Sequence, residues 1–172
     1  GFLPSHWIKL RNLLETDLTN SVNLIPVNWS TSITFGMLIT FSTCFMIVGF
    51  DIGSYFVGKK FGHHSLSPIS PSKTIEGVFG GLIFSILIGA FFGYLLRWEF
   101  GIFIGIFIGV LVALFSLVGD LTESMLKRNA GLKDSGNVLP GHGGILDRID
   151  SYLFTPAIVF YIVILLSPLI IS

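Results

Sequence analysis

The sequence predicts an all-α polytopic membrane protein with about four transmembrane helices and a charged loop region on one side of the membrane. Of its 172 residues, 52% are hydrophobic and only 12% are charged, which is too few polar groups to cover a soluble domain of this size. The mean hydropathy is +0.83. The charges are also unevenly distributed, and four long stretches contain none. Stretches of roughly 20 uncharged residues can cross a hydrocarbon core as helices.

These four uncharged stretches define the elements in order. Each is predicted to be a helix, because a backbone inside a bilayer must satisfy its own hydrogen bonds. Glycines recur at small-residue spacing, as at Gly89 and Gly93 and at Gly105 and Gly109. This spacing allows membrane helices to approach closely, although glycines that lipid merely tolerates explain it equally well. The predicted spans lie near residues 33–50, 77–96, 102–118 and 152–171.

Residues 1–32 precede the first span and are predicted to be an interfacial or irregular connecting segment. The stretch Trp7–Leu14 within this segment is also compatible with a short amphipathic helix. The chain begins at Gly1, and no basic stretch followed by a short apolar core marks a signal peptide. We therefore expect a fragment of a longer protein.

The ten basic and ten acidic side chains cancel, so the net charge is zero. Without a basic field to hold a phosphate backbone, no nucleic-acid partner is expected. Seven of the ten basic residues lie in loops 51–76 and 119–151, which alternating spans place on one side. The positive-inside rule assigns that side to the cytosol. The prediction is an integral multi-pass protein of the cell (inner) membrane or an equivalent organelle membrane, with its charged loops facing the cytosol.

The second of these loops concentrates the acidic residues. Asp120, Glu123 and Lys127 recur at helical spacing and share one face if the third span continues as a helix. Asp147 and Asp150 repeat this spacing just before the fourth span. Four carboxylates from two helices suit a hard divalent cation such as Mg²⁺, shared with a substrate phosphate. A solvated charged loop with ordinary ion pairs explains the spacing about as well.

Two further segments suggest phosphate binding. Three glycines surround His142 between the acidic stripes, where they bring backbone N–H groups close to a ligand, although most such loops are simply turns. His142 itself is compatible with phosphate binding, with acid or base chemistry, or with a structural role in the turn. The segment Ser70–Thr74 is predicted to be a hydroxyl-rich helix start, in which Lys73 contacts phosphate or the hydroxyls merely cap the helix.

The residues between the acidic stripes carry a specific resemblance. Residues 124–150 read SMLKRNAGLKDSGNVLPGHGGILDRID, and this motif closely resembles the signature of the phosphatidate cytidylyltransferases, also called CDP-diacylglycerol synthases. The segments DIGSYFVGKKFG at 51–62 and SPSKTIEG at 70–77 are similar to the same family. The resemblance runs from about residue 33 to the end. It implies that residues 33–172 are the C-terminal catalytic membrane domain of such an enzyme.

The resemblance implies a nucleotidyl transfer in phospholipid biosynthesis, in which CTP and phosphatidic acid in the bilayer give CDP-diacylglycerol and pyrophosphate. It also implies a homodimer. Its metal carboxylates would be Asp120 and Asp147, with Asp150 as a third, around Mg²⁺ and a second cation such as K⁺. These three acids and Lys127 would be the catalytic residues. The implied substrate-binding residues are Lys73, Ser124, Arg128, Lys133, Asp134, His142, Gly143, Gly144 and Arg148.

Two other functions remain open from the residues alone. The charged motif describes the nucleotide and metal end of the site better than the lipid end, so a related enzyme with another lipid acceptor fits equally well. Acidic residues close to a membrane also mark cation pathways. A pathway of that kind leaves the glycine-rich loop and the neighbouring basic residues unexplained.

Overall fold

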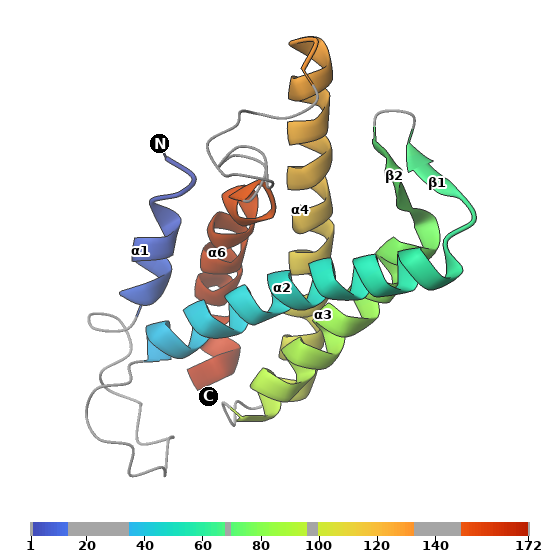
Figure 1. Cartoon of the computed structure of the whole chain (residues 1–172). Coiled ribbons are helices and arrows are strands. Elements are labelled where there is room, and N and C mark those ends of the chain that lie inside the picture. The colour runs from blue at the N-terminus through green and yellow to red at the C-terminus, as the bar shows by residue number, and fades with distance from the viewer. Residues whose placement is uncertain (1, 14–34, 68–69, 96–99, 133–148, 172) are drawn as a thin grey trace.

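The computed structural model describes residues 2–13, 35–67, 70–95, 100–132 and 149–171. The elements are α1 (His6–Arg11), α2 (Phe35–Phe61), β1 (Ser65–Ser67), β2 (Ser70–Thr74), α3 (Ile75–Leu95), α4 (Gly101–Asn129) and α6 (Ser151–Ile171). Figure 1 shows α2 crossing α4 and α6, with the small hairpin beyond one end of α2. Three of the helices, α2, α3 and α4, are long and apolar enough to cross a membrane, and α6 contains a shorter apolar stretch, Ser151–Leu166.

Each of the four predicted spans forms a helix, but two of these helices extend further than their uncharged stretches. Helix α2 continues past Asp51 to Phe61, and α4 continues past Asp120 to Asn129. The first predicted loop, 51–76, is therefore wrong as a loop, because most of it belongs to α2, the hairpin and α3. Charges mark where a helix leaves hydrocarbon, whereas the helix itself can continue into the polar region.

The hairpin is a β element that the all-α prediction did not contain. Strands β1 and β2 pair antiparallel, with Ser65 opposite Thr74 and Ser67 opposite Ser70. The predicted helix start at Ser70–Thr74 is thus a strand, which Pro71 favours because a residue preceding proline avoids helical angles. Thr74 plays the predicted capping role, since its Oγ1 accepts a hydrogen bond from the N–H of Gly77 at 3.2 Å.

Helices α3 and α4 pack backbone against backbone through glycines. A Cβ atom at Gly89 would fall 3.1 Å from the carbonyl carbon of Gly105, and one at Gly105 would fall 2.7 Å from that of Gly89. Side chains at either position would force the two helices apart. The small-residue spacing predicted for these spans is therefore used for helix packing.

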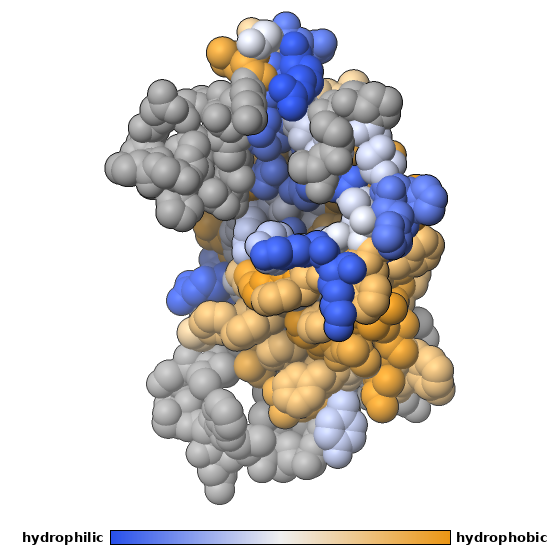
Figure 2. Space-filling view, turned by 45° about the vertical axis from the view of Figure 1, so that its right-hand side comes forward, coloured by the Kyte–Doolittle hydropathy of each residue, from blue (hydrophilic) through white to orange (hydrophobic). Residues whose placement is uncertain are grey.

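Among the residues that the structure describes, an apolar core joins α1, α2, α4 and α6. The short helix α1 contributes Leu10, and the indole N–H of Trp7 donates to the carbonyl oxygen of Tyr152 in α6 at 3.2 Å. Apolar side chains cover the lower part of the molecule in Figure 2, and hydrophilic side chains gather toward the other end. The core residues are Leu10, Ile39, Met46, Ile47, Ile104, Ile108, Val112, Val159 and Val163.

The variant Gly89→Val tests the close contact between α3 and α4. We expect it to lower the free energy of unfolding by about 1 to 3 kcal/mol, because the added side chain overpacks the interface. Leu87→Val is the matched control, since Leu87 lies on the same helix and is 61% exposed. Thermal unfolding in detergent measures both, and equal midpoints for the two variants would contradict this packing role.

Candidate functional site

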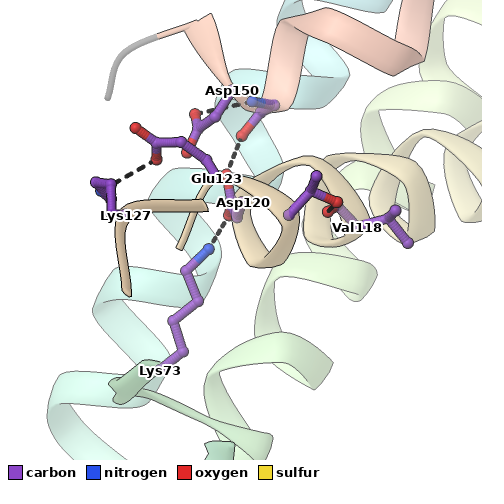
Figure 3. A network of polar contacts seen from close by, with 8 residues as sticks. Lys73, Val118, Asp120, Glu123, Lys127 and Asp150 are labelled. Atoms are coloured by element: carbon purple, nitrogen blue, oxygen red, sulfur yellow. Dashed lines mark hydrogen bonds and ion pairs between the residues drawn. The ribbon is translucent and has the colours of Figure 1, made fainter. Parts of the chain in front are cut away.

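The candidate site is centred on the carboxylate of Asp120, near the charged end of α4. Its Oδ1 accepts a hydrogen bond from the hydroxyl of Ser151 at 2.6 Å, and its Oδ2 forms an ion pair with the Nζ atom of Lys73 (Figure 3). Asp120 is buried, with its side chain 10% exposed. Three elements, β2, α4 and α6, therefore meet at one carboxylate.

A glycine beside Asp120 allows α6 to begin there. A Cβ atom at Gly119 would lie 3.0 Å from the carbonyl carbon of Asp150 and 3.3 Å from the Cα atom of Ser151. The carboxylate of Asp150 precedes α6 and accepts the backbone N–H of Ser151 at 2.8 Å. Figure 3 shows Asp150 close to Asp120 and Glu123, where α4 and α6 meet.

One turn further along α4, the predicted acidic face continues. Glu123 is buried, and its Oε2 lies 3.2 Å from the Nζ atom of Lys127. Ser124 is half-buried beside them, while Arg128 is exposed near the end of the helix. Because the side chains of Asp120 and Glu123 are only 10% and 6% exposed, the alternative of a fully solvated charged face is wrong for these two residues.

Lys73 reaches this cluster from the hairpin and is surrounded by negative charge. Burial lowers the pKa of Lys73 from its usual range, and the nearby carboxylates of Asp150, Asp51 and Glu123 act in the opposite direction. Asp120 is its direct partner. Four carboxylates therefore face one lysine that has lost part of its hydration.

A cavity of about 420 Å³ opens beside Lys73 and Asp120, between α2, β2, α3 and α4. Its wall is mixed: Phe50, Val78 and Leu117 contribute apolar surface next to the charged pair. Thr74 of β2 adds a hydroxyl, and one face of α2 supplies further polar groups. These α2 residues are Asp51, Ser54, Tyr55 and Lys59.

The α2 residues are functional candidates that the sequence prediction missed. They follow one another at i, i+3, i+4 and i+8 from Asp51, which is the spacing of a single helical face. The sequence contains this spacing, but a prediction that begins a loop at Asp51 does not use it, because spacing places side chains on one face only if the segment is helical.

The donor chemistry around Asp120 suits a hard cation, because carboxylate oxygens are the ligands that Mg²⁺ prefers. Within the ranges that the structure describes, no three acidic, histidine or cysteine side chains converge as a complete metal site. Several predicted residues lie outside those ranges, including the metal candidate Asp147. These are Lys133, Asp134, His142, Gly143, Gly144, Asp147 and Arg148.

The variant Ser151→Ala tests the contact that joins α6 to α4. Removing the hydroxyl leaves a buried carboxylate oxygen without this donor, and we expect a loss of about 1 to 3 kcal/mol in the free energy of unfolding. Thr122→Ala is the control, because the Thr122 hydroxyl donates to the carbonyl of Val118 in its own helix at 2.7 Å. Chemical denaturation compares them, and a Ser151→Ala midpoint equal to that of the control would exclude a stabilising role for this contact.

Comparison with known proteins identifies relatives of this chain. A phosphatidate cytidylyltransferase of Synechocystis sp. is 45% identical over 177 residues, which cover 98% of this chain and 60% of the relative. The chloroplastic phosphatidate cytidylyltransferase 4 of Arabidopsis thaliana is 40% identical over 93% of this chain and 42% of its own length. The phosphatidate cytidylyltransferase of Bacillus subtilis is 41% identical over 77% of this chain and 50% of its own length.

The chain thus spans about half the length of these curated relatives. Their similarity and the apolar helices confirm the prediction of a helical, multi-pass membrane protein. A family model described as "Cytidylyltransferase family" matches residues 9–166. Because this match spans most of its length, the chain belongs to the cytidylyltransferase family.

Proposed function

We propose that the protein transfers the cytidylyl group of CTP to phosphatidate. The observation that carries this proposal is the cavity beside Lys73 and Asp120, whose wall contains both charged groups and apolar side chains. A lipid phosphate needs both surfaces, since its headgroup is charged and its chains stay in the hydrocarbon. Membership of the cytidylyltransferase family supports the same reaction.

In the proposed reaction, an oxygen of the phosphatidate phosphate attacks the α-phosphorus of CTP. The bond between that phosphorus and the oxygen bridging to the β-phosphate breaks, and pyrophosphate leaves. The products are pyrophosphate and CDP-diacylglycerol, which stays in the membrane. No strong general base is required, because the attacking phosphate already carries negative charge at neutral pH. His142 therefore has no assigned proton-transfer role.

The residues of the site act mainly through their charge. Asp120 and Asp150, with Asp147, would hold Mg²⁺, and the same cluster has the charge to accept a second cation such as K⁺. When bound, Mg²⁺ neutralises phosphate charge and aligns the reacting groups. Lys73 and Lys59 line the cavity from two sides and would contact phosphate oxygens there. Lys127 and Arg128 would contact phosphate near the end of α4, with Ser124 as a polar neighbour.

The remaining predicted contacts complete the proposal. Lys133, Asp134, His142, Gly143, Gly144 and Arg148 would bind the nucleotide from the segment between α4 and α6. The end of α4 that carries Lys127 and Arg128 would face the cytosol together with the start of α6, in agreement with the positive-inside rule. The homodimer remains a prediction, and light scattering of the protein in detergent tests it.

The first test is the formation of CDP-diacylglycerol in liposomes that contain phosphatidate, with CTP and Mg²⁺ added and the lipid product followed by mass spectrometry. We expect Asp120→Asn and Asp147→Asn to lower turnover by about a hundredfold or more, because charge stabilisation is lost at the reacting phosphates. The control is Glu99→Gln, which lies between α3 and α4 in the sequence. The full protein is used in every case.

Full turnover in Asp120→Asn at saturating Mg²⁺ would contradict the role of this carboxylate. A folded protein that binds CTP but makes no CDP-diacylglycerol would indicate another lipid acceptor. A folded protein that does not bind CTP would contradict the proposed reaction itself.

Lys127→Ala tests the role of the α4 lysine in nucleotide binding. We expect the Michaelis constant for CTP to rise by about tenfold, which corresponds to the loss of one charge-assisted contact. Lys60→Ala is the control, since Lys60 lies at the end of α2 over the ring of Phe61. Steady-state kinetics measure both variants, and equal Michaelis constants for Lys127→Ala and the parent would argue against the contact.

A further inference from the structure

Lys73 belongs both to the wall of the cavity and to the acidic cluster around Asp120. If Lys73 binds substrate phosphate, its ammonium group should be available in the cavity that it lines. Instead, its Nζ atom contacts Oδ2 of Asp120, the carboxylate proposed to hold the metal (Figure 3). Lys73 therefore lies between the cavity and the proposed metal ligand, and its ammonium group contacts that ligand.

The charge balance explains why Lys73 adopts this contact. Asp51, Asp120, Glu123 and Asp150 form the negative cluster, and all four act on Lys73 by direct contact or through their field. Within the described part of the chain, these four carboxylates outnumber the two lysines that pair with them, and Asp120 and Glu123 are buried. Negative charge that is withdrawn from water attracts a divalent cation and also holds a lysine within reach.

The contacts of Asp120 make these two cations competitors. Its Oδ1 is occupied by the neutral hydroxyl of Ser151, which fixes the orientation of the carboxylate. Its Oδ2 is occupied by Lys73. A metal ion bound at Oδ2 would lie beside the ammonium group, and two adjacent cations repel each other strongly.

The backbone that carries Lys73 is held in place, so an exchange needs only the side chain to move. Strand β2 pairs with β1, and Thr74 caps α3 directly after it. The Nδ1 atom of His64 lies 2.7 Å from Oε1 of Glu76, which ties the start of the hairpin to α3. A lysine side chain has a flexible four-carbon stem and can swing between two anionic partners.

We propose that Lys73 is an exchangeable counter-ion, which neutralises Asp120 while the metal position is empty and turns to a phosphate in the cavity when a divalent cation binds. This inference rests on the proposed function, because it takes Asp120 as a metal ligand. It gives Lys73 a positioning role that couples the two binding events. Cation binding releases the lysine, and the released lysine strengthens the binding of an anionic ligand.

The first experiment measures Mn²⁺ binding to the full protein in lipid nanodiscs by calorimetry, without nucleotide. We expect Lys73→Met to bind Mn²⁺ about tenfold more tightly or better than the parent, because a competing charge is removed from the carboxylate. Lys60→Met is the matched control. Lys60 lies at the end of α2, where its Nζ atom lies over the ring of Phe61, and it does not line the cavity, so its removal should change Mn²⁺ affinity less than twofold.

The outcomes separate this inference from the proposed function. Unchanged or weaker Mn²⁺ binding in Lys73→Met, or equal tightening in both variants, overturns the exchange while leaving the metal role intact. The absence of Mn²⁺ binding in every form overturns the metal role and the exchange together.

A second measurement uses the unmodified protein, so it does not depend on the folding of a variant. The ε-amine of Lys73 is labelled with an acetylating reagent in the presence and absence of Mg²⁺, and its modification is quantified by mass spectrometry. We expect labelling of Lys73 to increase severalfold when Mg²⁺ binds, with Lys59 unchanged as the internal reference. Equal labelling of Lys73 under both conditions would overturn the exchange.

Discussion

The buried carboxylate of Asp120 has to be neutralised, because an unpaired charge that is withdrawn from water is costly. Lys73 and Ser151 meet this requirement from β2 and α6, two elements distant in the sequence. The Lys73 contact therefore helps to position the hairpin relative to α4, and the Ser151 contact does the same for the start of α6. The Lys73 contact also brings the cavity and the acidic cluster together, so the electrostatics of one side chain organise the polar end of the molecule.

The apolar part of the chain provides the rigid support for this arrangement. Gly89 and Gly105 let α3 and α4 meet at backbone distance, and Gly119 does the same for α4 and the start of α6. In hydrocarbon, helices gain little from burying apolar surface against each other, so such close packing supplies much of the association. The polar side chains therefore lie on helices whose relative positions are fixed. A reaction that depends on the alignment of charged groups requires such fixed positions.

The wall of the cavity contains charged and apolar side chains, and this combination suits an amphiphilic substrate. The helices that line the cavity, α2, α3 and α4, are long and apolar enough to cross a membrane. A soluble nucleotide and a membrane lipid could both reach such a position. Membership of the cytidylyltransferase family and the chemistry of the cavity therefore point in the same direction through independent observations.

The sequence alone determined the class of the protein and the identity of its spans, because hydrocarbon excludes charge and the uncharged stretches are unmistakable. It also indicated the acidic face of Asp120 and Glu123, since helical spacing is a local property. Helix ends were less predictable: a charge marks the membrane boundary, and α2 continues beyond it. Only tertiary structure could place Lys73 on Asp120 and bring the α2 face of Asp51 to the same cavity, because these contacts join elements whose relative positions depend on packing across the whole chain.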